Sequence, residues 1–404
     1  MSHLPDLLLV THRVPFPPDR GDRVRTFHLL RFLARRARVH LASLVDEPVS
    51  DDTVKFLSGA CARVHGVPLG RMHSMRGLRS FLLGGTISEG VFRSKRFAKQ
   101  IEEWTSQTRF SAAVASSASM ARYLRVPGLR QATKIVDMVD VDSEKWFDFA
   151  AASGQPKKWV YQTEARRLRR REKAICSWAD VVTLVSDHEA AVMREVTGTD
   201  NIHTVTSGVD LRYYAPGRHG PEAGCLFVGA LNTLPNVDAI TWFAHTVWPH
   251  LRHRRPEARL RVVGRRPVAA VRELGEIPGI EVVGTVSDVR PYLDEAAVVV
   301  APLRFARGLQ TKVLEAMAAG KAVVATPAAL ASLGEHGDLP AIAASEPDEW
   351  VESVCRLLES QSERRHLGQA GRRYAEQHHN WDNCLEPLGH LLRKRDQLPV
   401  AVPV

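Results

Sequence analysis

The sequence predicts an α/β protein built from two Rossmann-like, doubly wound domains. Its 404 residues exceed what one ordinary hydrophobic core holds. Short apolar runs alternate with helix-like stretches along the chain, a pattern typical of mostly parallel sheets covered by helices. This alternation stops in a stretch rich in Pro, Gly and charged residues at Ala215–Gly224 and then restarts, so we place the interdomain linker there.

The first domain is predicted to cover residues 1–214. It begins with a strand that leads into a helical stretch at Arg23–Ala37, and it contains a long basic helix around Lys157–Ala179. The predicted strands are Leu7–His12, Val39–Val45, Ala112–Ser117, Lys134–Asp140 and Asp180–Ser186.

The second domain is predicted to cover residues 215–380, with a helix across Val237–Leu251. Residues 381–404 are expected to form a C-terminal helix and a frayed tail. The predicted strands of the second domain are Cys225–Leu231, Arg259–Arg265, Ile280–Val286, Ala296–Pro302 and Lys321–Thr326.

The composition narrows the class of protein. No apolar run approaches the roughly 18 to 20 residues that span a bilayer, and the N-terminus lacks the basic region and cleavage site of a signal peptide. Five widely spaced cysteines without a C-x-x-C pair indicate neither a zinc ribbon nor a disulfide framework, so we expect a cytoplasmic protein. The net charge of +10 favours polyanionic partners. Much of it lies at Arg166–Lys173, which is either a solvated basic face or a contact with phosphates of an anionic membrane.

The segment Ala301–Thr326 carries the clearest functional pattern. An apolar run ends there, a basic turn containing glycine follows, and a helix with apolar spacing runs to Gly320. Unpaired N–H groups and the helix dipole make such a turn an anion site. Glu315, one turn inside the helix, could accept hydrogen bonds from a diol, which suggests a nucleotide diphosphate. The glycines could equally mark ordinary helix ends without a ligand. A capping role, however, suits Glu315 poorly, because with Thr311 as the N-cap residue Glu315 would stand one position too far along for a capping box.

The segment resembles the C-terminal signature of retaining GT-B glycosyltransferases of family four. The sequence of Ala306–Met317 is most similar to that of exopolysaccharide sugar transferases associated with exosortase (PEP-CTERM) systems. Two features depart from the family pattern. Arg307 stands where the first glutamate of E-x7-E is usual, and Ala230 and Asn236 replace a basic pair. Further similar motifs lie at Gly21–Leu30, Val182–Ala190, Ser207–Pro216, Phe227–Ile240 and Val286–Pro302.

The resemblance implies that the last helix packs back on the first domain and that the donor site lies in the second domain. Glu315 would bind the ribose, and the lost basic pair would be replaced by Arg304, Arg307 and Lys312, which we assign as catalytic cations. The backbone N–H groups of four loop residues would face the diphosphate, and three further residues would flank the nucleotide. The loop residues are Gly308, Leu309, Gln310 and Thr311, and the flanking residues are Gly229, Gly264 and Arg265.

The resemblance also implies an acceptor side in the first domain. Its glycine loop contains Gly21, expected to approach the donor, with Arg20 and Arg25 beside it; a proline-rich surface loop without a role is the alternative. Asp137 or Asp140 would orient a hydroxyl or act as a base, and we assign Asp140 as catalytic. Asp140-Val141-Asp142 has the D-x-D form that binds metal in the GT-A fold, whereas GT-B needs none. N-capping by Asp142 or Ser143 is equally compatible with the pattern.

Together these observations predict a retaining glycosyltransferase. It would move a sugar from a nucleotide diphosphate sugar to an exopolysaccharide or polyprenyl-linked glycan precursor, without a metal or other cofactor and without binding nucleic acid. Peripheral contact with an anionic membrane would fit a lipid-linked acceptor. Two alternatives are a nucleotide-sugar epimerase of the same double-Rossmann build and a non-catalytic basic protein that binds nucleic acid or membrane surfaces.

Overall fold

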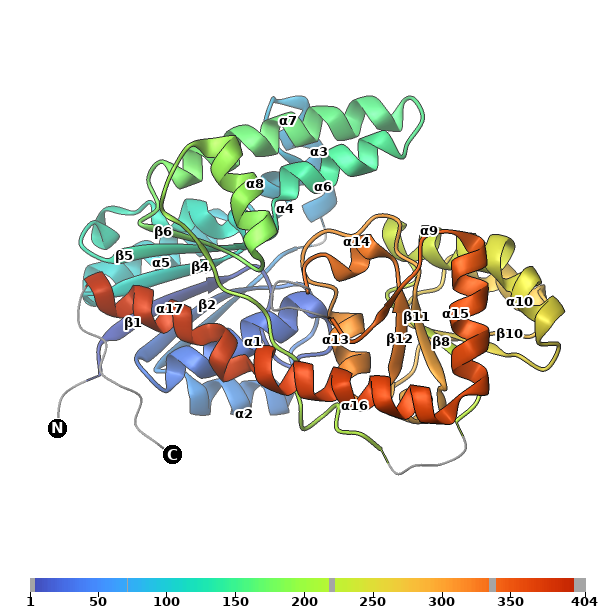
Figure 1. Ribbon diagram of the computed structural model, residues 1–404. Coiled ribbons are helices and arrows are strands. Elements are labelled where there is room, and N and C mark those ends of the chain that lie inside the picture. Colours follow the sequence, from blue (N-terminus) through green and yellow to red (C-terminus); the bar gives the residue numbers. More distant parts are fainter. Residues whose placement is uncertain (1–3, 71, 218–221, 334–338, 396–404) are drawn as a thin grey trace. The chain divides into compact units, whose positions relative to one another are not determined.

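The computed structural model describes residues 4–70, 72–217, 222–333 and 339–395 (Figure 1). The chain divides into two compact units: one contains residues up to Thr206 together with those from Leu385 onward, and the other contains Ser207–Cys384. The predicted boundary at residue 214 therefore falls inside the second unit. Residues 218–221 of the expected linker and the tail at 396–404 lie outside the described residues.

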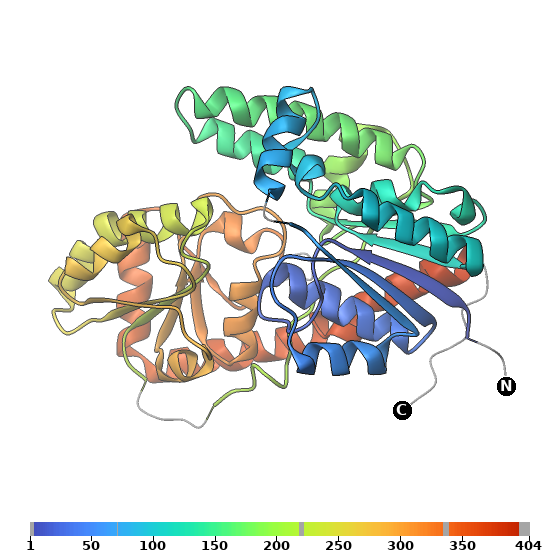
Figure 2. The ribbon, with the colours of Figure 1, turned by 180° about the vertical axis from the view of Figure 1, so that it is seen from behind.

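The first unit is a seven-stranded parallel sheet with the strand order β3-β2-β1-β4-β5-β6-β7. Helices cover both faces of this sheet in Figures 1 and 2. The strands are β1 (Asp6–Thr11), β2 (Arg38–Val45), β3 (Arg63–Pro68), β4 (Ala112–Ser116), β5 (Thr133–Val139), β6 (Val181–Leu184) and β7 (Ile202–Thr204). The helices that matter below are α1 (Gly21–Ala34), α2 (Asp51–Ala60), α3 (His73–Leu82), α4 (Ile87–Val91), α6 (Asp142–Ala151), α7 (Lys157–Cys176) and α8 (Asp187–Thr197).

The second unit is a six-stranded parallel sheet with the order β10-β9-β8-β11-β12-β13. Its strands are β8 (Cys225–Val228), β9 (Leu260–Val263), β10 (Ile280–Gly284), β11 (Val298–Ala301), β12 (Ala322–Ala325) and β13 (Ile342–Ala343). Its main helices are α9 (Leu234–Trp242), α10 (Trp248–Arg254), α13 (Thr311–Ala318), α15 (Pro347–Glu359) and α16 (Gln361–His378). Each unit has its own buried apolar core.

The predicted α/β class with two Rossmann-like domains is confirmed. In both sheets the first strand of the unit lies in the middle and the chain continues outward on each side, so the strand order reverses between β1 and β4 and between β8 and β11. Ligands of doubly wound folds bind beyond the carboxyl ends of the strands at such reversals. The two places to search for a site are therefore the ends of β1 and β4 and the ends of β8 and β11.

The last helix, α17 (Trp381–Arg395), returns to the first unit, as the sequence analysis expected. From Leu385 onward its residues group with that unit. Arg36, just after α1, donates a 2.8 Å hydrogen bond to the Glu386 carboxylate, and Gly389 lies against Phe32. Within the described residues, no helix is both long enough and apolar enough to span a bilayer.

Candidate functional site

The loop between β11 and α13 brings backbone donors to the reversal point of the second sheet. Gly308 adopts a left-handed backbone (φ 61°), which a residue with a side chain rarely adopts. Among the described residues, the N–H groups of Gly308, Leu309 and Gln310 donate to no carbonyl, whereas Thr311 donates to the Leu309 carbonyl at 3.0 Å. Three of the four N–H groups expected to face a diphosphate thus have no carbonyl acceptor within the part of the chain that the structure describes, and that of Thr311 has one.

Lys312, in the first turn of α13, supplies a cation beside this loop. Its ammonium donates to Oδ1 of Asn236 on α9 and lies 5.6 Å from the centre of the Phe227 ring. Burial lowers the pKa of Lys312 to about 8, against the opposing charge of Glu315. Asn236 occupies a position where the resemblance implies a basic residue. Lys312 therefore brings positive charge to the same place from a different element.

Glu315 lies on the next turn of α13 and is not a helix cap, because Gln310 is the N-cap residue and no side chain caps the helix. Burial raises the pKa of Glu315 to about 7, although a hydrogen bond from the Tyr214 hydroxyl and the charge of Lys312 oppose the shift. An acid and an amine whose pKa values both move toward neutrality are typical of functional sites. The Glu315 carboxylate retains acceptor capacity for a further hydroxyl group.

Tyr214 and Arg372 also belong to this site, although the sequence alone did not indicate either residue. The Arg372 guanidinium on α16 donates to the carbonyls of Tyr214 at 3.0 Å and of Ala318 at 2.7 Å, so it ties the Tyr214 segment to the end of α13. Asp210 accepts hydrogen bonds from the N–H groups of Arg212 and Tyr213 and so holds the turn that precedes Tyr214. The repeated aromatic residues at 213 and 214 were the only sequence signal.

The two predicted arginine cations have other surroundings. Arg304 makes a two-pronged ion pair with Asp238 on α9, at 2.9 and 2.5 Å, and its side chain is about half exposed. The Asp238 carboxylate offsets the positive charge of Arg304, so this arginine is less suited to binding a phosphate. The Arg307 carbonyl accepts a 2.9 Å hydrogen bond from the Gln310 side chain. Lys312 therefore has surroundings that fit a phosphate ligand better than those of Arg304 do.

Gly229 and Gly264 allow the ends of β8 and β9 to approach each other. A Cβ atom on Gly264 would lie 1.6 Å from the Gly229 carbonyl oxygen, and one on Gly229 would lie 2.9 Å from the Asn236 side chain. The Arg265 carbonyl accepts from the N–H of Leu231 at 2.9 Å in the same turn. This crowding gives both glycines a packing role, whatever the ligand.

Gly264→Ala is therefore expected to destabilise the second unit by at least about 1–3 kcal/mol, the cost of overpacking a tight contact. Thermal unfolding measures this loss. Gly275→Ala is the matched control, because its Cβ would meet only Val282 at 3.7 Å. An unchanged melting temperature for Gly264→Ala would show that the contact relaxes freely.

In the first unit, Arg25 and Asp137 bind each other. The Arg25 guanidinium on α1 contacts both Asp137 carboxylate oxygens at 2.9 and 2.7 Å, and both residues are buried. Thr183 also donates to Asp137 at 2.8 Å. Arg25 further donates to the carbonyls at positions 205 and 206. The geometry favours a structural role for both side chains over the acceptor-side role predicted for them.

Other predicted residues of this unit lie around the start of α1. Gly21 is the first residue of the helix, with open space where a side chain would be, while Arg20 pairs with Glu47 at 2.9 Å and with Asp46 at 3.4 Å. Despite burial, hydrogen bonds and charges from His12 and Arg13 hold the pKa of Asp22 well below its usual range. The Nδ1 atom of His12 lies 3.4 Å from the Ser116 carbonyl oxygen, at the reversal between β1 and β4.

Asp140 follows an unusual piece of backbone. Val139 has a φ of 74°, costly for a β-branched residue, and the pairing of β5 with β6 shifts register there. Burial raises the pKa of Asp140 to about 7, with Glu189 and Asp142 adding to the shift and Lys145 opposing it. A carboxyl group that titrates near neutrality can exchange a proton under physiological conditions. Among the described residues, no three His, Cys, Asp or Glu side chains cluster as metal ligands do.

N-capping does not explain this acidic segment. Val141 is the N-cap residue of α6 without any side-chain cap, so the suggested capping by Asp142 or Ser143 is wrong. Ser143 instead donates from its N–H and its hydroxyl to the buried Glu172 carboxylate on α7. Ser186 does cap α8, by accepting from the N–H of Glu189 at 3.2 Å.

Comparison with known proteins agrees with this architecture. No curated protein sequence matches the chain. Sucrose-phosphate synthase from Thermosynechococcus elongatus has a similar structure, with a TM-score of 0.72 at 16% identity over 96% of this chain and 98% of that one. TarM aligns with a TM-score of 0.70 at 9% identity over 97% and 99% of the two chains. HepE from Anabaena, solved with UDP and glucose, aligns with a TM-score of 0.66 at 12% identity over 96% and 99%.

At these identities the structural likeness establishes the fold alone. The sequence comparison adds that residues 222–360 match the family described as Glycosyl transferases group 1. That range contains β8, the Asn236 segment, the loop before α13, and both Lys312 and Glu315. The chain thus has the two-domain fold of GT-B glycosyltransferases, and its second unit carries the sequence pattern of glycosyl transferases group 1.

Proposed function

We propose that this protein is a retaining glycosyltransferase that uses a nucleotide diphosphate sugar. The observation that carries the proposal is that Lys312 and Glu315 lie on one helix face at the β8–β11 reversal, next to loop N–H groups without a carbonyl acceptor among the described residues. Positive charge and N–H donors suit a diphosphate, and a carboxylate one turn further along suits a ribose diol. The family match of residues 222–360 and the UDP bound by HepE support the same assignment.

The proposed reaction breaks the bond between the anomeric carbon and the diphosphate and joins that carbon to an acceptor hydroxyl oxygen. Lys312 and the N–H groups of Gly308, Leu309 and Gln310 would stabilise the charge that develops on the leaving diphosphate. Glu315 would hold the ribose. In the first unit, Asp140 is the group that we propose for the acceptor side, because its pKa of about 7 lets it take up the hydroxyl proton.

The acceptor is proposed to be an exopolysaccharide or lipid-linked glycan precursor, and the reaction is proposed to need no metal. TarM has been solved with UDP and a GlcNAc-glycerol compound, which is an example of a glycan ligand on this fold. Incubation with donor alone separates this proposal from an epimerase, because an epimerase would convert the sugar without an acceptor.

Glu315→Ala is expected to weaken UDP binding about 10- to 150-fold, the loss of about 1.5–3 kcal/mol from hydrogen bonds to a charged group. Calorimetric titration with UDP measures this directly. Glu276→Ala is the matched control, because Glu276 is an exposed glutamate in the same unit. Unchanged UDP affinity in Glu315→Ala would refute the ribose assignment.

A further inference from the structure

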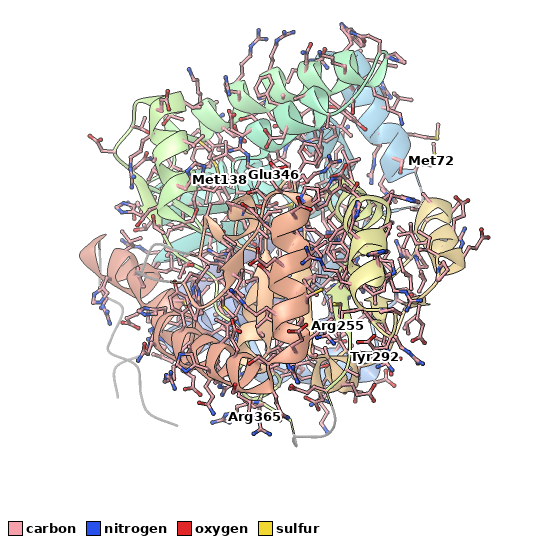
Figure 3. The ribbon with its side chains drawn as sticks, turned by 45° about the vertical axis from the view of Figure 1, so that its right-hand side comes forward. Met72, Met138, Arg255, Tyr292, Glu346 and Arg365 are labelled. Carbon is pink, nitrogen blue, oxygen red and sulfur yellow. The ribbon has the colours of Figure 1, made fainter. Side chains whose placement is uncertain are left out.

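Helix α3 presents an unusually apolar surface to solvent. Met72, just before the helix, and Met75, Leu78 and Leu82 within it are spaced three or four residues apart and so share one face, and Leu83 follows directly after the helix. Their exposed fractions are 62% for Met72, 61% for Met75, 59% for Leu78, and 75% each for Leu82 and Leu83. We call these five residues the α3 apolar face; Met72 is labelled in Figure 3. Grouped exposure of large apolar side chains marks an interaction surface.

The opposite face of α3 is firmly packed, so the apolar face is held outward. Gly77 lies against Ile87 and Val91 of α4, and a Cβ on Gly90 would clash with Ser80. The buried Phe81 ring packs under the Arg167 guanidinium of α7 at 4.6 Å. Arg167 also donates to the carbonyls of Phe81 and Gly85. Figures 1 and 2 both show α3 and α4 beside α7.

These contacts also revise the interpretation of the basic run at Arg166–Lys173. Arg167 is used to hold α3, Arg169 pairs with Glu144, and Arg171 pairs with Glu89 at 3.0 Å. Three of its cations thus join helices within the unit. The run on α7 therefore does not form one free basic face, although Arg166, Arg170 and Lys173 remain exposed.

A cavity of about 1050 Å³ opens beside α3 and is strongly basic. We call it the basic cavity. Seven arginine and lysine residues line it against one glutamate, Glu89, which Arg171 neutralises. Arg76 is occupied by the carbonyls of Leu69 and Arg93. The other five cations are exposed and have no ion pair among the described residues: Arg79, Arg93, Lys95, Arg122 and Arg125.

We propose that α3 docks this protein on the surface of an anionic lipid bilayer. The α3 apolar face would lie at the boundary between headgroups and acyl chains, and the basic cavity would take up lipid phosphates. An exposed apolar helix face next to concentrated positive charge is the combination that binds anionic membrane surfaces. Trp159 on α7, 59% exposed and in edge contact with Phe81, adds an aromatic side chain suited to the interface. The proposal concerns the first unit and does not depend on the proposed sugar transfer.

Co-sedimentation of the full chain with vesicles tests the proposal. We expect binding to vesicles of phosphatidylcholine mixed with phosphatidylglycerol, and weaker binding at high salt or to pure phosphatidylcholine. Leu78→Ser/Leu82→Ser/Leu83→Ser should weaken binding on the order of 100-fold, since each buried leucine contributes substantially to transfer from water. Arg93→Glu/Arg122→Glu should weaken it about tenfold or more and remove the preference for phosphatidylglycerol.

Val54→Ser/Lys55→Glu on α2 is the matched control, because it changes an exposed apolar and an exposed basic residue of the same unit. Thermal unfolding of each variant should match that of the wild type, since every substituted side chain is exposed. The proposal would be overturned if the wild-type protein did not bind anionic vesicles, or if the triple serine variant bound them as well as the wild type does. So would a wild-type dimer that the triple serine variant converts to a monomer, because a second copy would then cover the face. Binding of inorganic pyrophosphate without binding of vesicles would point instead to a soluble anion.

Discussion

Replacing Lys312 by methionine is expected to reduce sugar transfer about 100- to 1000-fold, the typical effect of removing one preorganised group that stabilises developing charge. Methionine keeps an aliphatic chain of similar length over Phe227 and removes only the ammonium that contacts Asn236. UDP binding should also weaken, about 10- to 150-fold, because the diphosphate loses a hydrogen-bonded contact with a charged group.

The same residue gives the site a pH dependence. Burial lowers the pKa of Lys312 to about 8, so the amine is charged below that pH and neutral above it. UDP affinity should therefore fall as the pH rises through about 8, and this fall should be absent in Lys312→Met. Calorimetry at a series of pH values measures both effects.

Arg356→Met on α15 serves as the control, because that arginine is about half exposed and pairs only with Glu363 among the described residues. Its UDP affinity should match that of the wild type at every pH. If Lys312→Met binds UDP as tightly as the control, the diphosphate is held elsewhere. The paired Arg304 and the Arg307 region would then be the next candidates.

The difference between Lys312 and Arg304 shows how far the sequence could lead. Both were recognisable as cations near a loop before a helix, because strand, glycine turn and helix are local patterns. Arg304 pairs with Asp238, 66 positions away, and Lys312 contacts Asn236, 76 positions away. Such contacts depend on which side chains the folded sheet brings together, and no spacing rule contains that information.

The same limit applies to the fold. The sequence predicted the buried strands around Leu7, Val39, Ala112 and the other central positions, because continuous apolar runs identify strands that are covered on both faces. It did not reveal β3, β7 or β13. The last two have only three and two residues, and β3 is largely exposed at the sheet edge, so none carries a long apolar run. Tyr214 was missed for a related reason, since its role depends on a tertiary contact with Glu315.

Removing one member of the Arg25–Asp137 pair should have the largest effect on stability. Arg25→Met leaves a buried carboxylate with Thr183 as its remaining described partner, and breaking a buried ion pair in this way costs about 3–5 kcal/mol. The carbonyls at 205 and 206 lose their donor as well. The urea midpoint for unfolding of the first unit should drop accordingly, whereas Arg31→Met on the exposed side of α1 should stay within about 0.5 kcal/mol of the wild type.

The double variant Arg25→Met/Asp137→Leu decides between a structural and an acceptor-binding role. Replacing both charges by apolar groups removes the uncompensated carboxylate, so most of the lost stability should return. If the pair serves only to join α1 to β5, sugar transfer should return with it, because neither charge touches a substrate. If stability returns but transfer does not, at least one of the two side chains contacts the acceptor, as the sequence analysis predicted. The outcome therefore separates a buried ion pair that builds the first unit from one that the reaction also needs.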